Sequence, residues 1–245
     1  MDNLKRYKSS AELKALAKEH LFGRYGTTIG AFIIVYMITM FITFFSTVFI
    51  DITSIIGLIL NFIISFVISV MAGLFTSGEK YLYLKISCNQ RVTVSDVFYG
   101  FKLFPNKAIL IQLYISIFIY IAMLPMTILS YMIRQNPGDA VLTLVYSLAI
   151  IFYGVVITIV TLIYSQAFYL LHDFPNYTAQ ELLAMSNKLM KGSKGRLFYL
   201  MVSFFPLLLL GLFSCGIAYL WLIPYINATN AEFFLDLIQN NKVSD

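Results

Sequence analysis

The chain has 245 residues, of which 60% are hydrophobic and 12% are charged, and its mean hydropathy is +0.82. Soluble domains have about 45–50% apolar and about 25% charged residues, so this composition excludes an ordinary water-soluble fold. The formal net charge of +5 comes from basic residues that flank long apolar segments, which favours a membrane protein over a nucleic-acid-binding one.

Six segments are predicted to span a membrane as helices, because a crossing needs about 20 mostly apolar residues. In chain order they cover residues 28–50, 52–83, 108–133, 140–171, 197–213 and 215–237. The last two are interrupted by Pro206 and Pro224, and Gly211 and Gly216 lie between these prolines. The alternative is one long helix across 197–223, which would give five spans in total. Proline and glycine weaken a helix interior, so two short spans are favoured.

The basic residues predict the orientation of these spans. Of the 17 lysines and arginines, six lie before the first span, five after the second and four after the fourth. The opposite side of the predicted bundle has only Arg134. Since basic connections stay in the cytoplasm, we expect a multi-pass protein of the cell membrane with a cytoplasmic N-terminus, and with six spans a cytoplasmic C-terminus.

Three segments on the basic side begin with the same helix-start pattern, in which a hydroxyl residue precedes an acidic one by three positions. The pairs are Ser9 and Glu12, Thr93 and Asp96, and Thr178 and Glu181. Such a capping box satisfies free backbone N–H groups at a helix start. Gly23, Gly100 and Gly192 are then expected to end the three short helices.

The near-equal spacing of these starts predicts a threefold repeat within a single membrane domain over residues 1–245. The units are approximately 9–92, 93–177 and 178–240, each a short amphipathic helix followed by a helical hairpin. Neighbouring units of a repeat bury faces that one unit leaves open. The predicted fold is therefore an all-α integral membrane bundle of about six transmembrane helices.

The short cytoplasmic helices have two competing interpretations. Apolar and weakly polar residues recur at helical spacing in the first helix, at Leu13, Leu16, Ala17, His20 and Leu21, and share one face of the third, at Leu182, Met185, Ser186 and Leu189. These faces either lie in the inner headgroup layer, with lysines toward anionic lipid, or pack against the ends of the spans.

Polar residues in or near the spans are the candidate site residues, because they are costly in a membrane. They are Asn61, Glu79, Gln166, Asn227, Asn230 and Glu232. Asn61 alone is best explained by a hydrogen bond between helices. The second, fourth and sixth spans each end with a polar residue before aromatic ones, which indicates either an interfacial aromatic belt or a polar ring where three helices converge.

Catalytic signatures are weak in this sequence. It has no phosphate-binding glycine loop, nucleophile elbow or paired-cysteine zinc pattern, so no catalytic residue, metal site or cofactor is predicted. His172 and Asp173 are a weak candidate pair at the end of the fourth span, since a histidine beside a carboxylate titrates near neutral pH or binds a metal.

Several short motifs carry a resemblance to a known family. They are Leu189-Met190-Lys191-Gly192, Ser203-Phe204, the segment 216–225, Thr229, Ala231, Phe233, the segment 13–18 and Tyr99-Gly100-Phe101. In these the chain resembles the bacterial domain-of-unknown-function family numbered 975, with Phe205-Pro206 where the family more often has Gly-Trp. It is more distantly similar to the membrane domain joined to glycerophosphodiester phosphodiesterases, which implies an association with lipid. The resemblance implies a bacterial multi-span protein and supplies no activity or catalytic residue.

Three functions remain open at this point. The first is a non-enzymatic module of the bacterial cytoplasmic membrane that interacts with lipids or serves as an accessory, with membrane lipids as partners and no nucleic acid. The second is a small transporter or export component with a polar cavity between its spans. The third is a membrane-embedded lipid enzyme that uses His172 and Asp173.

Overall fold

Every secondary-structure element in the described residues is a helix, which confirms the all-α prediction. The computed structural model describes residues 7–48, 50 and 52–242. The first part of the chain forms α1 (Ser10–Leu21), α2 (Tyr25–Val48) and α3 (Ile55–Ser87). The middle forms the 3-10 helix η1 (Val94–Phe98), α4 (Tyr99–Lys102), α5 (Pro105–Gln135), α6 (Ala140–Tyr164) and α7 (Ala167–Asp173). The last part forms α8 (Ala179–Leu189), α9 (Lys194–Val202), α10 (Phe205–Phe213) and α11 (Tyr219–Lys242).

Within the described ranges, five helical segments are long and apolar enough to cross a membrane. They are Tyr25–Ser46, Ile55–Ser87, Pro105–Gln135, Ala140–Asp173 and Lys194–Phe213. At most 22% of the most apolar 18-residue stretch of any of them is buried inside the protein. Such apolar outer faces are stable against lipid and not against water. Helix α11, the predicted sixth span, is not among the five, so the count of six stays a prediction.

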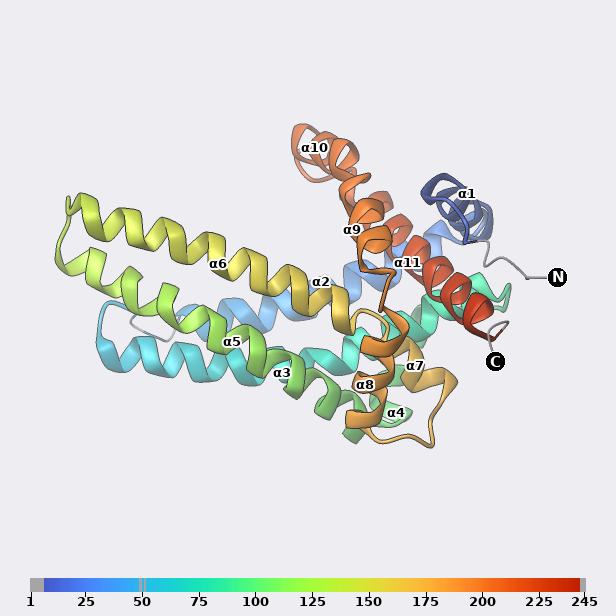
Figure 1. Ribbon diagram of the computed structural model, residues 1–245, viewed down its shortest axis with the longest axis horizontal. Coiled ribbons are helices and arrows are strands. Elements are labelled where there is room, and N and C mark those ends of the chain that lie inside the picture. Colours follow the sequence, from blue (N-terminus) through green and yellow to red (C-terminus); the bar gives the residue numbers. More distant parts are fainter. Residues whose placement is uncertain (1–6, 49, 51, 243–245) are drawn as a thin grey trace.

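The long helices lie next to one another in the order α2, α3, α5, α6. In Figure 1 these four extend toward one side of the molecule, whereas α10 projects away from them. Helix α11 returns from the tip of α10 and packs on α1, α2 and α3. The ends of α2, α3, α5 and α6 that lie near α11 therefore form the meeting point of the whole fold.

The densest core lies at this end and not between the long helices. We call the helices gathered there, α1, η1, α4, α7, α8 and α11, the end layer. Its fully buried side chains include Leu13, Tyr169, Leu182 and Phe233. The sequence did not decide whether the apolar faces of α1 and α8 contact lipid headgroups or other helices. Both are buried in this core: Leu13, Ala17 and Leu21 of α1 and Leu182 of α8 are at most 1% exposed. These two faces pack on the ends of the spans and do not face headgroups.

All three predicted capping boxes are present. In each box the carboxylate of the acidic residue accepts from the backbone N–H of the first residue, at Ser9, Thr93 and Thr178. The hydroxyls of Ser9 and Thr178 in turn accept from the backbone N–H of Glu12 and Glu181. Gly23 and Gly192 adopt φ values of +74° and +83°, as expected for left-handed helix stops.

The expectation for Gly100 is wrong. Gly100 is buried inside α4, and the left-handed residue before the next long helix is Phe104, with φ +55°. Gly100 is glycine for a different reason: a Cβ there would lie 1.9 Å from the carbonyl oxygen of Leu74 on α3. It permits the close approach of two helix backbones.

Two predicted spans each consist of two helices. The break in the fifth span, next to Pro206, agrees with the predicted interruption, whereas the break in the fourth span is not predicted. The segment 140–171 is α6 followed by α7, with the break at Ser165 and Gln166. The segment 197–213 is α9 followed by α10, with the break at Ser203 and Phe204, just before Pro206. Proline has no N–H to continue the helix, which explains the second break. The predicted sixth span begins later than residue 215, at Tyr219, because Cys215 and Gly216 form a tight turn with φ values of +52° and +87°.

Candidate functional site

Helix α11 contacts α3 and α7, which form the ends of the second and fourth predicted spans. The ring of Tyr169 on α7 stacks on Phe234 of α11, with 5.1 Å between centroids. The ammonium of Lys80 on α3 lies 5.5 Å from the centroid of the Tyr169 ring. Three segments that end similarly in sequence thus contact one another in space.

Lys80 and Asn227 link two of these helices through hydrogen bonds. Nζ of Lys80 donates to Oδ1 of Asn227 over 3.0 Å. The hydroxyl of Tyr169 donates to the backbone carbonyl of Asn227 over 3.5 Å. A lysine within an apolar helix is costly unless its ammonium is hydrogen-bonded, and Asn227 supplies one such acceptor.

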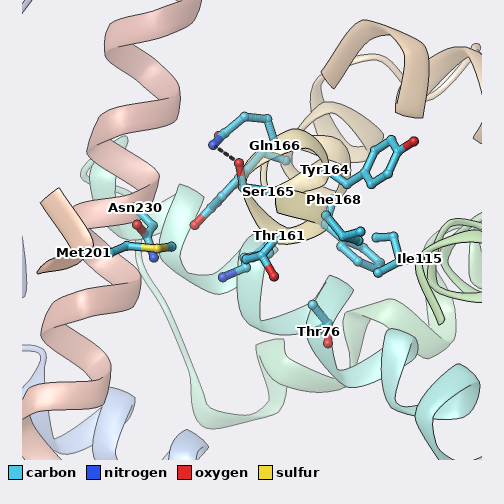
Figure 2. A pocket seen from close by; sticks show the side chains of 12 residues that line it. Thr76, Ile115, Thr161, Tyr164, Ser165, Gln166, Phe168, Met201 and Asn230 are labelled. Carbon is cyan, nitrogen blue, oxygen red and sulfur yellow. Dashed lines mark hydrogen bonds between the residues drawn. The ribbon is translucent and has the colours of Figure 1, made fainter. Parts of the chain in front are cut away.

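A cleft of about 180 Å³ opens beside this contact. Its lining combines polar and apolar side chains. The polar ones belong to Lys80, Thr161, Ser165, Gln166 and Asn230, and the apolar or aromatic ones to Ile115, Val160, Tyr164, Phe168 and Met201. Figure 2 shows Asn230 and Met201 on one side of the cleft, with Thr161 and Thr76 across from them and Ile115, Phe168 and Tyr164 beyond. The arrangement is amphipathic and lies at the ends of the spans.

Gln166 is the most deeply buried polar residue of this cleft, at 1% exposure. Its Nε2 donates to the hydroxyl of Ser165 over 2.8 Å, and that hydroxyl in turn donates to the carbonyl of Leu162 over 3.3 Å. Because the Ser165 proton is already used, the Gln166 amide is fixed with Nε2 toward Ser165. Its Oε1 is buried and has no hydrogen-bond partner among the described residues. A buried acceptor without a donor costs about 1–3 kcal/mol, which points to a missing group at this position.

Helix α1 contacts the C-terminal end of α9, the helix that carries Met201. Nζ of Lys14 donates to the carbonyl of Ser203 over 3.0 Å and lies 4.1 Å from the centroid of the Phe204 ring, at the break between α9 and α10. The hydroxyl of Tyr225 on α11 donates to the carbonyl of Lys14 over 3.3 Å. Partial burial and the nearby charge of Lys18 lower the pKa of Lys14. The contacts fix α9 and α11 relative to each other, and hence one side of the cleft.

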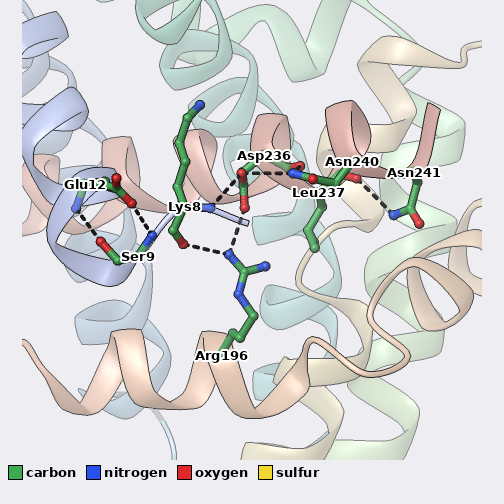
Figure 3. A network of polar contacts seen from close by, with 8 residues as sticks. All are labelled: Lys8, Ser9, Glu12, Arg196, Asp236, Leu237, Asn240 and Asn241. Atoms are coloured by element: carbon green, nitrogen blue, oxygen red, sulfur yellow. Dashed lines mark hydrogen bonds and ion pairs between the residues drawn. The ribbon is translucent and has the colours of Figure 1, made fainter. Parts of the chain in front are cut away.

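A second polar network joins α9 to α11 on the outer side of the end layer (Figure 3). Arg196 donates from one guanidinium nitrogen both to Oδ2 of Asp236 over 2.8 Å and to the carbonyl of Lys8 over 2.9 Å. The backbone N–H of Lys8 donates to the other carboxylate oxygen of Asp236 over 3.2 Å. The side chain of Asp236 is only 1% exposed, so the network is a structural clamp on the end of α11.

Of the predicted site residues, Gln166, Asn227 and Asn230 gather at the cleft or its immediate contact with Lys80. Glu79 is half-buried one position before Lys80 and is not part of the cleft lining. Glu232 lies elsewhere in the end layer, where its carboxylate accepts from Nδ1 of His20 over 2.7 Å. Asn61 is half-buried near the start of α3 and makes no side-chain hydrogen bond to the described residues, so the predicted bond between helices is not found.

His172 and Asp173 are not brought together as a pair. Nε2 of His172 donates to the backbone carbonyl of Ser77 over 2.9 Å, which attaches α7 to α3. Asp173 is exposed. In the part of the chain that the structure describes, no three His, Cys, Asp or Glu side chains are placed to hold a metal ion.

Sequence reasoning missed Lys80, Thr161 and Tyr169 as parts of the site. Lys80 was counted among the basic residues that predict orientation. It follows Glu79 inside an apolar helix, however, and two adjacent charged residues in a span indicate a functional site. Thr161 and Tyr169 carried no such signal, because one threonine or tyrosine in a span is common at membrane interfaces.

The apolar outer faces, the five candidate spans and the polar end layer define a multi-pass helical membrane protein. The family described as Protein of unknown function (DUF975) matches residues 1–241, and the chain belongs to that family. Neither a curated protein nor a solved structure matches the chain. The comparison therefore confirms the family resemblance and leaves function to be argued from the site.

Proposed function

We propose that this protein is a non-enzymatic, lipid-interacting module of the bacterial cytoplasmic membrane that holds one lipid molecule in the cleft at the inner ends of its spans. The observation that supports the proposal is the mixed lining of the cleft, in which polar side chains such as Lys80 and Gln166 occur together with apolar ones such as Val160 and Phe168. A phospholipid has both a polar headgroup and apolar acyl chains, so it fits a lining of this kind.

The volume and the position of the cleft support a headgroup as its occupant. About 180 Å³ is enough for a phosphate with a small substituent and too little for a whole lipid. The acyl chains would then extend over the exposed apolar faces of α5 and α6, where Phe118 and Ile159 are about half exposed. Because the acyl chains of a membrane lipid are already in hydrocarbon, this face adds little to the affinity, and the headgroup contacts supply most of it.

The proposal includes an orientation and a repeat. The end layer, with α1 and the end of α11, is placed in the cytoplasm on the basis of the basic residues near it. Cysteine labelling in intact cells tests this placement, in a variant whose own Cys88 and Cys215 are replaced by serine. Lys102→Cys and Lys194→Cys should resist an impermeant reagent, whereas Gly138→Cys should react.

The three capping boxes support three repeat units over 9–92, 93–177 and 178–240.

The experiment that tests lipid binding is native mass spectrometry of the protein released from detergent. We expect one retained phospholipid on the full chain. Thr161→Trp should fill the cleft and abolish retention, whereas Thr158→Trp should leave it unchanged. Thr158 is exposed one turn earlier on the same helix and does not line the cleft, so it is a matched control.

Three outcomes would contradict the proposal. Equal lipid retention by both tryptophan variants would mean that the cleft is not the binding site. Flux of a polar solute through proteoliposomes, blocked by Thr161→Trp, would favour the transporter. Turnover of a lipid that depends on His172 and Asp173 would favour the enzyme.

A further inference from the structure

We infer that the cleft selects a phospholipid whose headgroup carries both a phosphate anion and an N–H or O–H donor, as ethanolamine and glycerol headgroups do and choline does not. The inference rests on the proposed function and specifies its ligand. It follows from the hydrogen bonds that two polar residues of the cleft lining, Lys80 and Gln166, lack.

Lys80 supplies the requirement for an anion. An ammonium has three N–H donors, and Nζ of Lys80 has one hydrogen-bond acceptor among the described residues, Oδ1 of Asn227. Two donors are left on a full positive charge at membrane depth, where both need acceptors. A phosphodiester oxygen is a strong acceptor of this kind.

Gln166 supplies the opposite requirement. Its Oε1 is a buried acceptor, and the amide cannot turn to use its Nε2 there, because Nε2 is held by the Ser165 hydroxyl. A phosphate at neutral pH has only acceptors and leaves Oε1 unsatisfied. The ammonium of an ethanolamine headgroup or a hydroxyl of a glycerol headgroup supplies the missing donor.

The remaining polar groups are compatible with such a headgroup. The hydroxyl of Thr76 already donates to the carbonyl of Ala72 over 3.1 Å, so toward the cleft it acts as an acceptor. The amide of Asn230 lines the cleft and makes no side-chain hydrogen bond with the described residues, so it offers both a donor and an acceptor. A trimethylammonium group would meet these acceptors with C–H groups only.

The test is a headgroup competition on the full-length protein. Purified protein in mixed micelles receives equal amounts of phosphatidylethanolamine, phosphatidylglycerol and phosphatidylcholine with identical acyl chains, and native mass spectrometry counts the retained lipid. We expect each of the first two to be retained about tenfold over phosphatidylcholine, which corresponds to 1.4 kcal/mol, the scale of one satisfied buried hydrogen bond. Gln166→Leu should remove this preference and still retain a lipid. Lys80→Gln should reduce retention of all three.

The control is Gln180→Leu, the same substitution at an exposed position of α8, which should keep the preference. If wild-type protein retains all three lipids equally, the headgroup inference is wrong while lipid binding stands. If it retains none of them, both the inference and the proposed function are wrong. The wild-type competition decides between these outcomes even if Gln166→Leu does not fold.

Discussion

The ammonium of Lys80 on α3 donates a hydrogen bond of 3.0 Å to the side-chain oxygen of Asn227 on α11, which joins α3 to the last helix of the chain. The bond lies at the point where the end layer meets the spans. It places a positive charge beside the cleft and also holds the cleft together.

Asn227→Ala should therefore destabilise the protein. The substitution leaves Nζ of Lys80 without its protein acceptor in an apolar layer, at a cost of about 1–3 kcal/mol. The free energy of unfolding in mixed micelles measures the effect. Asn61→Ala is the matched control, since Asn61 is also on a long helix and makes no side-chain hydrogen bond to the described residues. Equal losses in the two variants would contradict a stabilising role for the Lys80–Asn227 bond.

The contributions of Arg196 and Asp236 to the free energy of unfolding should be strongly coupled. Removing one partner of a buried ion pair typically costs about 3–5 kcal/mol, because the other charge stays buried and unpaired. We expect Asp236→Leu and Arg196→Met each to destabilise the protein, and the double variant to lose less than the sum of the two. A double-mutant cycle on unfolding free energies measures the coupling. Strict additivity would show that the 2.8 Å contact contributes nothing specific.

Gly78 and Gly154 should respond in opposite ways to alanine. A Cβ at Gly78 would lie 1.8 Å from the carbonyl oxygen of Val97, so Gly78→Ala must separate η1 from α3, and we expect a loss of at least about 1–3 kcal/mol. A Cβ at Gly154 on α6 meets nothing within 4 Å. Gly154→Ala should thus stabilise the helix by about 0.5–1 kcal/mol. Thermal unfolding of the two variants in the same detergent compares them, and a neutral Gly78→Ala would count against the close helix contact.

The capping box of α8 predicts a pH dependence. Hydrogen bonds from the backbone N–H and hydroxyl of Thr178 lower the pKa of Glu181 below its ordinary value of 4.5. A lowered carboxyl pKa contributes stability that is present above 4.5 and is lost as the pH falls through the folded-state pKa. Glu181→Gln should therefore lose less stability than wild type on acidification below pH 4.5. Unfolding midpoints across that range measure it. Glu19→Gln, at an exposed position of α1, should match wild type, and a similar flattening in both variants would rule out the cap as the cause.

The sequence predicted what depends on local chemistry and on hydrophobic length. Ser9, Thr93 and Thr178 begin helices because the capping box needs only residues three positions apart, and the long apolar helices follow from the lipid environment. Gly100 was misassigned, because glycine serves equally as a left-handed helix stop and as a site of close backbone approach. Only the position of Leu74 on another helix distinguishes the two.

The candidate site was predicted in part for a related reason. Gln166 and Asn230 were conspicuous because amides are costly in a membrane, whereas their proximity depends on the break between α6 and α7 at Ser165. The role of Lys80 depends on Asn227, which is 147 positions away in the chain. Contacts over such separations follow from packing, which periodicity and composition do not specify.

The most direct measurement is a structure of the full-length protein in nanodiscs that contain phosphatidylethanolamine and phosphatidylglycerol. We predict density for one phospholipid with its phosphate at hydrogen-bond distance from Nζ of Lys80 and a headgroup donor at Oε1 of Gln166. A cleft closed by its own side chains, with lipid only on the outer faces of α5 and α6, would contradict the proposed function.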